Sequence, residues 1–367
     1  MRQSAKVGDL DRVRKLLQKG TNGNATKTNG FTAQMEGLGV STIYHKFNVA
    51  PRELVRHDYE VDVNAKNQDG QTALMLASMN NHSHVVRELI KHGEVDVNAK
   101  NQDGSTALIL ASMKDYSDVV RELVNHDNVD ANAIIDIGDT ALMLACDAGN
   151  LAVVKELLKH DKVDVNARNE DGHTSLILAS MSEHSDVVRE LVKHDNVDPN
   201  AMIEIDHTAL MMACHVGSLV VVKELLKHDK VDANAKNDCG CTALMVASSD
   251  GELDIVDALL KHDMIDVNAE DDQGCNAFYD ASYFGHWDVV ERLAREDADF
   301  NVQGLLGCTA LIWACLRGRL EAVEMLLEHD SVDANLRNKA GSTALDIARS
   351  CQMLDIAQYL EEHAKSK

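Results

Sequence analysis

The feature that most constrains the fold of this chain is an internal repeat of 34 residues. The tripeptide Thr-Ala-Leu, or a close variant of it, returns at this spacing through most of the sequence, with one spacing of 33. The repeats begin at Thr72, Thr106, Thr140, Thr174, Thr208, Thr242, Asn276, Thr309 and Thr343. A period of this length indicates a solenoid, in which each unit contacts only its neighbours.

One unit, residues 140–173, shows what each repeat is expected to form. Thr140 is a suitable N-cap, because its hydroxyl can accept a hydrogen bond from a free amide of the first helical turn. Apolar residues then follow at helical spacing, and Gly149 suits the turn that ends the first helix. A second apolar stripe precedes the polar, turn-forming loop "VDVNARNEDG". Neither helix can bury its stripe alone, so neighbouring units must stack.

This unit resembles the ankyrin repeat family, whose pattern is Thr-Pro-Leu-His, a second helix rich in Val-Val and Leu-Leu, then Asp-Val-Asn and a hairpin with glycine. Here Thr-Ala-Leu-Met or Thr-Ala-Leu-Ile replaces Thr-Pro-Leu-His, and the loop "HDKVDVN" is one residue longer than usual. The resemblance implies an all-α solenoid of helix-turn-helix units. It also implies hairpin-like loops, called fingers, and a scaffold or adaptor that binds proteins without catalysis.

The repeat pattern suggests one solenoid domain over residues 1–367. We expect an N-terminal capping unit at 1–31, a degenerate repeat at 32–71, eight regular repeats at 72–342 and a C-terminal capping unit at 343–367. The degenerate repeat has extra residues at 37–51. These are either the remains of a decayed repeat or a loop that contacts a partner, and we expect them to be the least stable part.

Charge and composition narrow the classes of partner. The chain has 36 Lys and Arg against 60 Asp and Glu, a net charge of −24. This balance repels nucleic acid and anionic membranes and favours partner proteins with basic surfaces. The first residues lack the apolar stretch of a signal peptide, and eight cysteines without a pairing pattern suggest a reducing compartment. We expect a cytoplasmic or nuclear monomer that needs no cofactor.

Two fingers carry apolar residues where the others are polar. The stretch "IIDIGD" contains Ile134, Ile135 and Ile137, and "MIEIDH", 68 residues later, contains Met202, Ile203 and Ile205. Their repeats match at 24 of 34 positions, which indicates duplication of a two-repeat block. The side chains are either two exposed ridges that bind a partner or a by-product of that duplication. At about 10 Å per repeat, the ridges would lie about 20 Å apart.

Aromatic residues mark a third candidate site. Seven of the 13 aromatic residues lie between 278 and 313. Phe278 and Trp287 fall on positions expected to face the core. Tyr283 and Phe284 fall at the end of a first helix, which in the resembled family faces the concave groove. One repeat further along, Leu316 and Arg317 hold the same positions, and the intervening finger carries Leu305 and Leu306. Tyr and Arg are frequent interface anchors, so we expect these residues to bind a protein.

Other regular series have structural interpretations. The Asp and Asn that recur in the loops are expected to hydrogen-bond locally. Histidines that end the second helices lie too far apart for a shared zinc ion. Cys146, Cys214 and Cys315 replace a small core residue. Two alternatives remain: a zinc-binding protein that uses the Cys239–Cys275 loop cluster, and the repeat region of a larger effector.

Overall fold

The computed structural model describes residues 62–366, apart from 92, 204–206 and 305. This part of the chain is all helical, with no strand longer than an isolated bridge between Ile134 and Thr140. The capping unit at 1–31, the 37–51 segment and most of the degenerate repeat lie outside the described residues. Among the described helices, none is both long and apolar enough to cross a membrane.

The chain divides into two compact units. Unit 1 consists of residues 1–182 and 194–197, and unit 2 of residues 183–193 and 198–367. The described helices of unit 1 are α3 (Ala73–Met79), α4 (Ser83–Ile90), α5 (Ala107–Ser112), α6 (Ser117–Val124), α7 (Ala141–Asp147), α8 (Leu151–Leu158) and α9 (Ser175–Met181).

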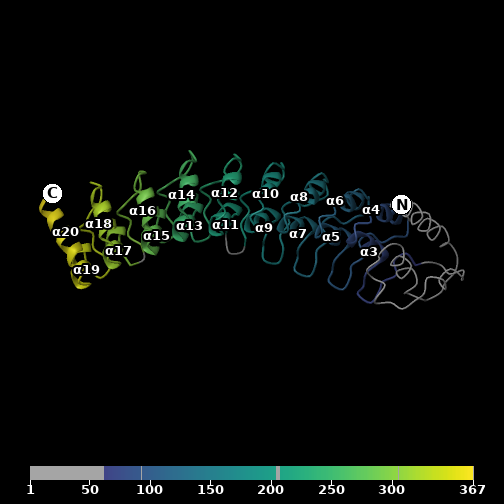
Figure 1. The fold of residues 1–367 in the computed structure, drawn as a ribbon, viewed down its shortest axis with the longest axis horizontal. Coiled ribbons are helices and arrows are strands. Elements are labelled where there is room, and N and C mark those ends of the chain that lie inside the picture. The colour runs from purple at the N-terminus through teal and green to yellow at the C-terminus, as the bar shows by residue number, and fades with distance from the viewer. Residues whose placement is uncertain (1–61, 92, 204–206, 305, 367) are drawn as a thin grey trace, which may run out of the picture. The chain divides into compact units, whose positions relative to one another are not determined.

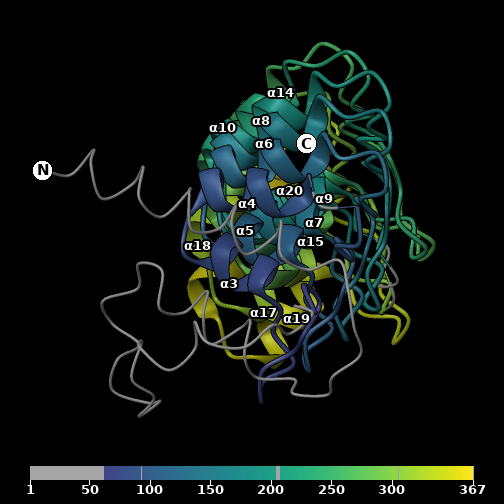
Figure 2. The same ribbon diagram turned by 90° about the vertical axis from the view of Figure 1, so that its right-hand side faces the viewer.

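Unit 2 continues the same alternation of helices (Figure 1). Its helices are α10 (Ser185–Val192), α11 (Ala209–His215), α12 (Leu219–Leu225), α13 (Ala243–Asp250), α14 (Leu253–Leu260), α15 (Ala277–Phe284), α16 (Trp287–Leu293), α17 (Ala310–Leu316), α18 (Leu320–Leu327), α19 (Ala344–Ser350) and α20 (Leu354–Ser366). Within each unit the odd-numbered inner helices form one row and the even-numbered outer helices another (Figures 1 and 2).

Every inner helix begins as its sequence predicts. The Oγ1 atom of Thr140 accepts a hydrogen bond from the amide of Met143 at 3.3 Å, and the other threonines of the series make the same contact. Asn276 does the same for α15 with its side-chain oxygen. The predicted N-cap is therefore confirmed. Each such cap contributes about 1 kcal/mol to its helix.

The core of each unit lies between its two rows of helices. In the repeat at residues 140–173, Leu142, Val153, Val154 and Leu157 are all buried. Burial of one such side chain contributes about 1.5–3 kcal/mol. Cys146, Cys214 and Cys315 are also buried, which confirms their predicted core position, and burial raises the pKa of each thiol. All eight cysteines are free.

Asparagines join each loop to the next within a unit. Asn98 donates a hydrogen bond through Nδ2 to the carbonyl of Asn128 at 2.7 Å and accepts one at Oδ1 from the amide of Asp130 at 2.8 Å. The same pair of bonds recurs at Asn64, Asn132, Asn200, Asn234, Asn268 and Asn301. The loop asparagines are thus hydrogen-bonding residues, as predicted, and they connect consecutive repeats.

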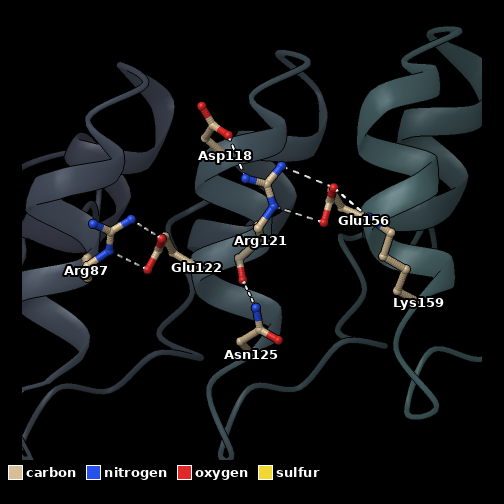
Figure 3. Close-up of polar contacts among 7 residues, drawn as sticks. All are labelled: Arg87, Asp118, Arg121, Glu122, Asn125, Glu156 and Lys159. Carbon is tan, nitrogen blue, oxygen red and sulfur yellow. Dashed lines mark hydrogen bonds and ion pairs between the residues drawn. The ribbon is translucent and has the colours of Figure 1, made fainter.

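Ion pairs connect the outer helices of unit 1 (Figure 3). The Nε atom of Arg87 on α4 lies 2.9 Å from a carboxylate oxygen of Glu122 on α6. Arg121 reaches Glu156 on α8 in the same way, with two contacts of 3.2 Å. The hydrogen bond from Arg87 lowers the pKa of Glu122. Because the arginines are largely exposed, each pair adds at most about 1 kcal/mol, and the series aligns neighbouring repeats more than it stabilises them.

The turn between inner and outer helix requires a left-handed backbone. Gly149 has φ of 70° there, but Asn81, Asp115 and Glu183 occupy equivalent turns with φ of 59°, 58° and 60°. A side chain in this conformation costs about 1–2 kcal/mol, less for Asn and Asp. The first repeat of each duplicated pair therefore contains a strained turn.

Replacing Glu183 with glycine should relieve this strain. We expect Glu183→Gly to raise the free energy of unfolding by about 0.5–1 kcal/mol, since the added freedom of glycine in the unfolded chain offsets part of the gain. Asn81→Gly is the matched control and should gain less, because Asn tolerates the conformation better. Urea denaturation measures both, and a loss of stability in Glu183→Gly would contradict the expectation.

Candidate functional site

Tyr283 and Phe284 lie at the end of inner helix α15 with their rings open to solvent. Their side chains are 40% and 51% exposed. Phe278, on the same helix, is buried as predicted, and its ring packs edge-on against Phe300 at 5.0 Å between centroids. Trp287 is half-buried, so it only partly occupies the predicted core position. The sequence thus separated the exposed aromatic pair from the buried phenylalanine of this repeat.

Contacts among rings hold Tyr283 in place. Its ring stacks on Tyr279 with centroids 6.2 Å apart and meets Phe284 and Trp313 edge-on, each at 4.9 Å. Trp313 comes from α17, the next inner helix, and is half-buried. Aromatic pairs in this geometry contribute about 0.5–1.5 kcal/mol beyond their buried area. We call Tyr283, Phe284 and Trp313 the aromatic cluster; ring contacts join the exposed Tyr283 and Phe284 to the half-buried Trp313.

The other predicted residues of this region differ in their exposure and in their contacts with the cluster. Arg317 is exposed, and its guanidinium donates a hydrogen bond to the carbonyl of Tyr283. Leu316 is half-buried at the end of α17. Leu306 is 54% exposed on the finger before α17, and Leu305 lies outside the described residues. Arg317 is therefore the predicted residue that directly connects the two repeats at the cluster.

Gly304 makes room for the ring beneath the cluster. Among the equivalent finger positions, five hold asparagine, for example Asn237 and Asn338, and the others hold Ile135, Ile203 and Asp271. A Cβ atom at Gly304 would lie 2.3 Å from the Cζ atom of Tyr279, closer than any real contact. Tyr279 is buried, and burial raises the pKa of its hydroxyl to about 12. The ring therefore occupies space that the other fingers fill with their own side chain.

This packing predicts that Gly304 and Tyr279 are energetically coupled. Gly304→Ala should lower the free energy of unfolding by about 1–3 kcal/mol, because the new methyl group overpacks the site. Tyr279→Met introduces the residue found at the equivalent Met75, Met143 and Met245, and should remove most of that loss. Urea denaturation of both single variants and the double variant measures the coupling. Additive losses would show that the two residues do not compete for space.

Asp280 is a residue of this site that the sequence analysis missed. It is the fourth residue of α15 and is half-buried. Burial, with a smaller contribution from the charge of Asp271, raises the pKa of its carboxyl to about 7. The signal is visible when the repeats are compared, because the same position holds Leu, Met, Val or Trp in the other regular repeats and Ile347 in the C-terminal capping unit. A carboxylate there cannot be explained by core packing.

The isoleucine finger of unit 1 is only partly exposed. Ile134 and Ile137 are 47% and 57% exposed, and Ile135 is half-buried. Ile135 takes the position of Asn101, whose Oδ1 accepts hydrogen bonds from the amides of Asp103 and Ser105 at 3.0 and 2.8 Å. Isoleucine has no acceptor, so this finger lacks the side-chain tie. Its backbone still closes through the amide of Ile135 and the carbonyl of Asp139 at 3.1 Å.

The described residues of the second isoleucine finger are less exposed than those of the first. Ile203 is buried, with 3% of its surface exposed, and Met202 is half-buried. Ile205 lies outside the described residues. Of the two alternatives for these side chains, the burial of Ile203 agrees with packing in the stack and not with an exposed ridge at that residue. The two fingers belong to different units, so a separation of about 20 Å stays a prediction.

The cysteine loops do not gather a set of metal ligands. Cys275 is buried and Cys239 is exposed, and burial raises the pKa of Cys241 to about 11, which disfavours the thiolate that zinc requires. Within the described ranges, no three His, Cys, Asp or Glu side chains lie close enough together to hold a metal ion. The described residues therefore give the zinc alternative no support.

Comparison with known protein families identifies the type of repeat. A family model described as "Ankyrin repeats (3 copies)" matches this chain four times, over residues 45–135, 128–203, 197–271 and 277–367. The matches cover most of the sequence, including both fingers with isoleucines and the repeat with the aromatic cluster.

Proposed function

Because the chain belongs to the ankyrin repeat family, whose repeats are generally modules for protein–protein interaction, we propose that it is a non-catalytic scaffold or adaptor. In this proposal the inner-helix face and the fingers bind the partner. The observation that carries it is the aromatic cluster, in which Tyr283 and Phe284 are exposed yet fixed by ring contacts. Exposed aromatic side chains of this kind are frequent binding hot spots.

The burial of other residues in this repeat supports a binding role for Tyr283 and Phe284 over a packing role. Phe278 and Tyr279 already fill the core at the start of α15, so the two later rings are not needed there. Arg317 adds a guanidinium beside them. On the finger of unit 1, Ile134 and Ile137 offer a further exposed apolar contact.

The compartment and the partner's character belong to the same proposal. Eight free cysteines, five of them buried, are consistent with a reducing environment such as the cytoplasm or nucleus. The net charge of −24 favours partner proteins with basic surfaces. We propose that the protein acts as a monomer.

Removal of the two exposed rings tests the proposed function. From a native lysate, the variant Tyr283→Ser/Phe284→Ser should capture at least tenfold smaller amounts of the main proteins that the wild type captures. Its melting temperature should fall by only a few degrees, because both rings lie at the surface while Phe278 and Tyr279 fill the core of this repeat. Quantitative mass spectrometry measures capture and circular dichroism measures melting.

The control removes two exposed apolar side chains of the same unit outside the cluster. Val220 and Met264 are 59% and 72% exposed, and Val220→Ser/Met264→Ser should capture the same proteins as the wild type. Unchanged capture by the Tyr283/Phe284 variant would contradict the proposal. A large loss of stability without a change in capture would assign the two rings to packing instead.

A further inference from the structure

Asp280 interrupts an apolar stripe on the inner helices of unit 2. The fourth residues of α11, α13, α17 and α19 are Met212, Val246, Trp313 and Ile347. Helices α13 and α17 pack directly against α15, so Asp280 holds the place in the stripe between Val246 and Trp313. A half-buried charge among apolar side chains costs free energy unless a partner compensates it.

Within the described residues, nothing compensates Asp280. Its carboxylate has neither a hydrogen-bond donor nor a cation as partner there. The preceding finger contributes Asp271, which repels it, and the neighbouring titratable groups Cys241 and Tyr279 are neutral near pH 7. From α13, Asp250 pairs with His215, and from α17, Arg317 bonds to the carbonyl of Tyr283.

The aromatic cluster provides the second half of a cation site. Tyr283 and Phe284 follow Asp280 by three and four residues on one helix, so all three share a face. Trp313 meets Tyr283 edge-on from the next helix. Aromatic ring faces attract ammonium and guanidinium groups by about 0.5–2 kcal/mol. A carboxylate beside exposed rings therefore fits the charged end and the apolar stem of one long basic side chain.

We propose that Asp280 and the aromatic cluster together bind a single lysine or arginine side chain of the protein partner. The charged group pairs with the Asp280 carboxylate, and the aliphatic stem lies along Tyr283 and Trp313. The net charge of −24 makes a basic partner complementary. This inference rests on the proposed function, and it adds the chemistry of the anchor that the site recognises.

Selection of peptides tests the anchor directly. Random 12-residue peptides displayed on phage are selected on the folded wild-type protein. We expect the selected peptides to share one Lys or Arg, and its replacement by norleucine to weaken binding at least tenfold. Asp280→Asn removes the charge with little change of shape and should weaken the basic peptides equally. Asp280→Leu, which introduces the residue of sibling repeats, should prefer peptides with an apolar anchor.

The pH dependence gives an independent readout. Since the pKa of Asp280 is about 7 and a bound cation favours the ionised carboxylate, affinity should rise from pH 6 to pH 8. The dependence should be lost in Asp280→Asn. Asp254→Asn, which removes an exposed carboxylate from outer helix α14, is the control and should bind and titrate like the wild type.

Three results would overturn the inference: no enrichment of Lys or Arg in the selected peptides, equal binding of basic peptides to Asp280→Asn, or a flat pH profile in the wild type. The Tyr283→Ser/Phe284→Ser variant separates this failure from that of the proposed function. If this variant binds peptides without a basic anchor more weakly than the wild type does, the cluster binds proteins and only the proposed Lys or Arg anchor is contradicted. If it weakens none, both proposals fail.

Discussion

In the described part of the chain, a single repeat cannot bury its own apolar stripe, so each helix depends on the repeat beside it. The buried Val153, Val154 and Leu157 show how completely neighbours meet this need within unit 1. Two polar series then fix how the repeats align: asparagines between the loops and arginine–carboxylate pairs between the outer helices. Apolar burial supplies most of the stability, and the polar series supply alignment.

The repeat with the aromatic cluster departs from its siblings in a coordinated way. Tyr279 replaces methionine in the core, and Gly304 in the next finger gives up its side chain to admit the ring. Tyr283 then stacks on Tyr279, and Trp313 closes against Tyr283. A substitution in one repeat therefore requires a matching substitution in the next. Such paired changes explain why this site spans two repeats.

The sequence predicted the fold well because the same pattern of apolar and capping residues recurs in many repeats. The threonine caps, the buried cysteines and the loop asparagines were all assigned correctly from their places in the unit. The exposed pair Tyr283 and Phe284 followed from the same register. For Ile203 the sequence left exposure and packing open, because Ile135 and Ile203 share one register position and still differ in burial. Asp280 was missed because a single acidic residue looks ordinary in an acidic chain until its burial is known.

Contacts between repeats hold the aromatic site in place, and amide hydrogen exchange of the Asn268→Ala variant tests this. Asn268 donates a hydrogen bond to the carbonyl of Asp297 and accepts one from the amide of Asp299, and so links the loop that precedes α15 to the loop that precedes α17. Loss of two such bonds costs about 1–3 kcal/mol. We predict at least tenfold faster exchange in α15 and α17, with α5 and α7 of unit 1 unchanged. Asn125→Ala, whose side chain bonds only within its own helix, should leave α15 and α17 unaffected. Unchanged protection of α15 and α17 in Asn268→Ala would contradict the claim.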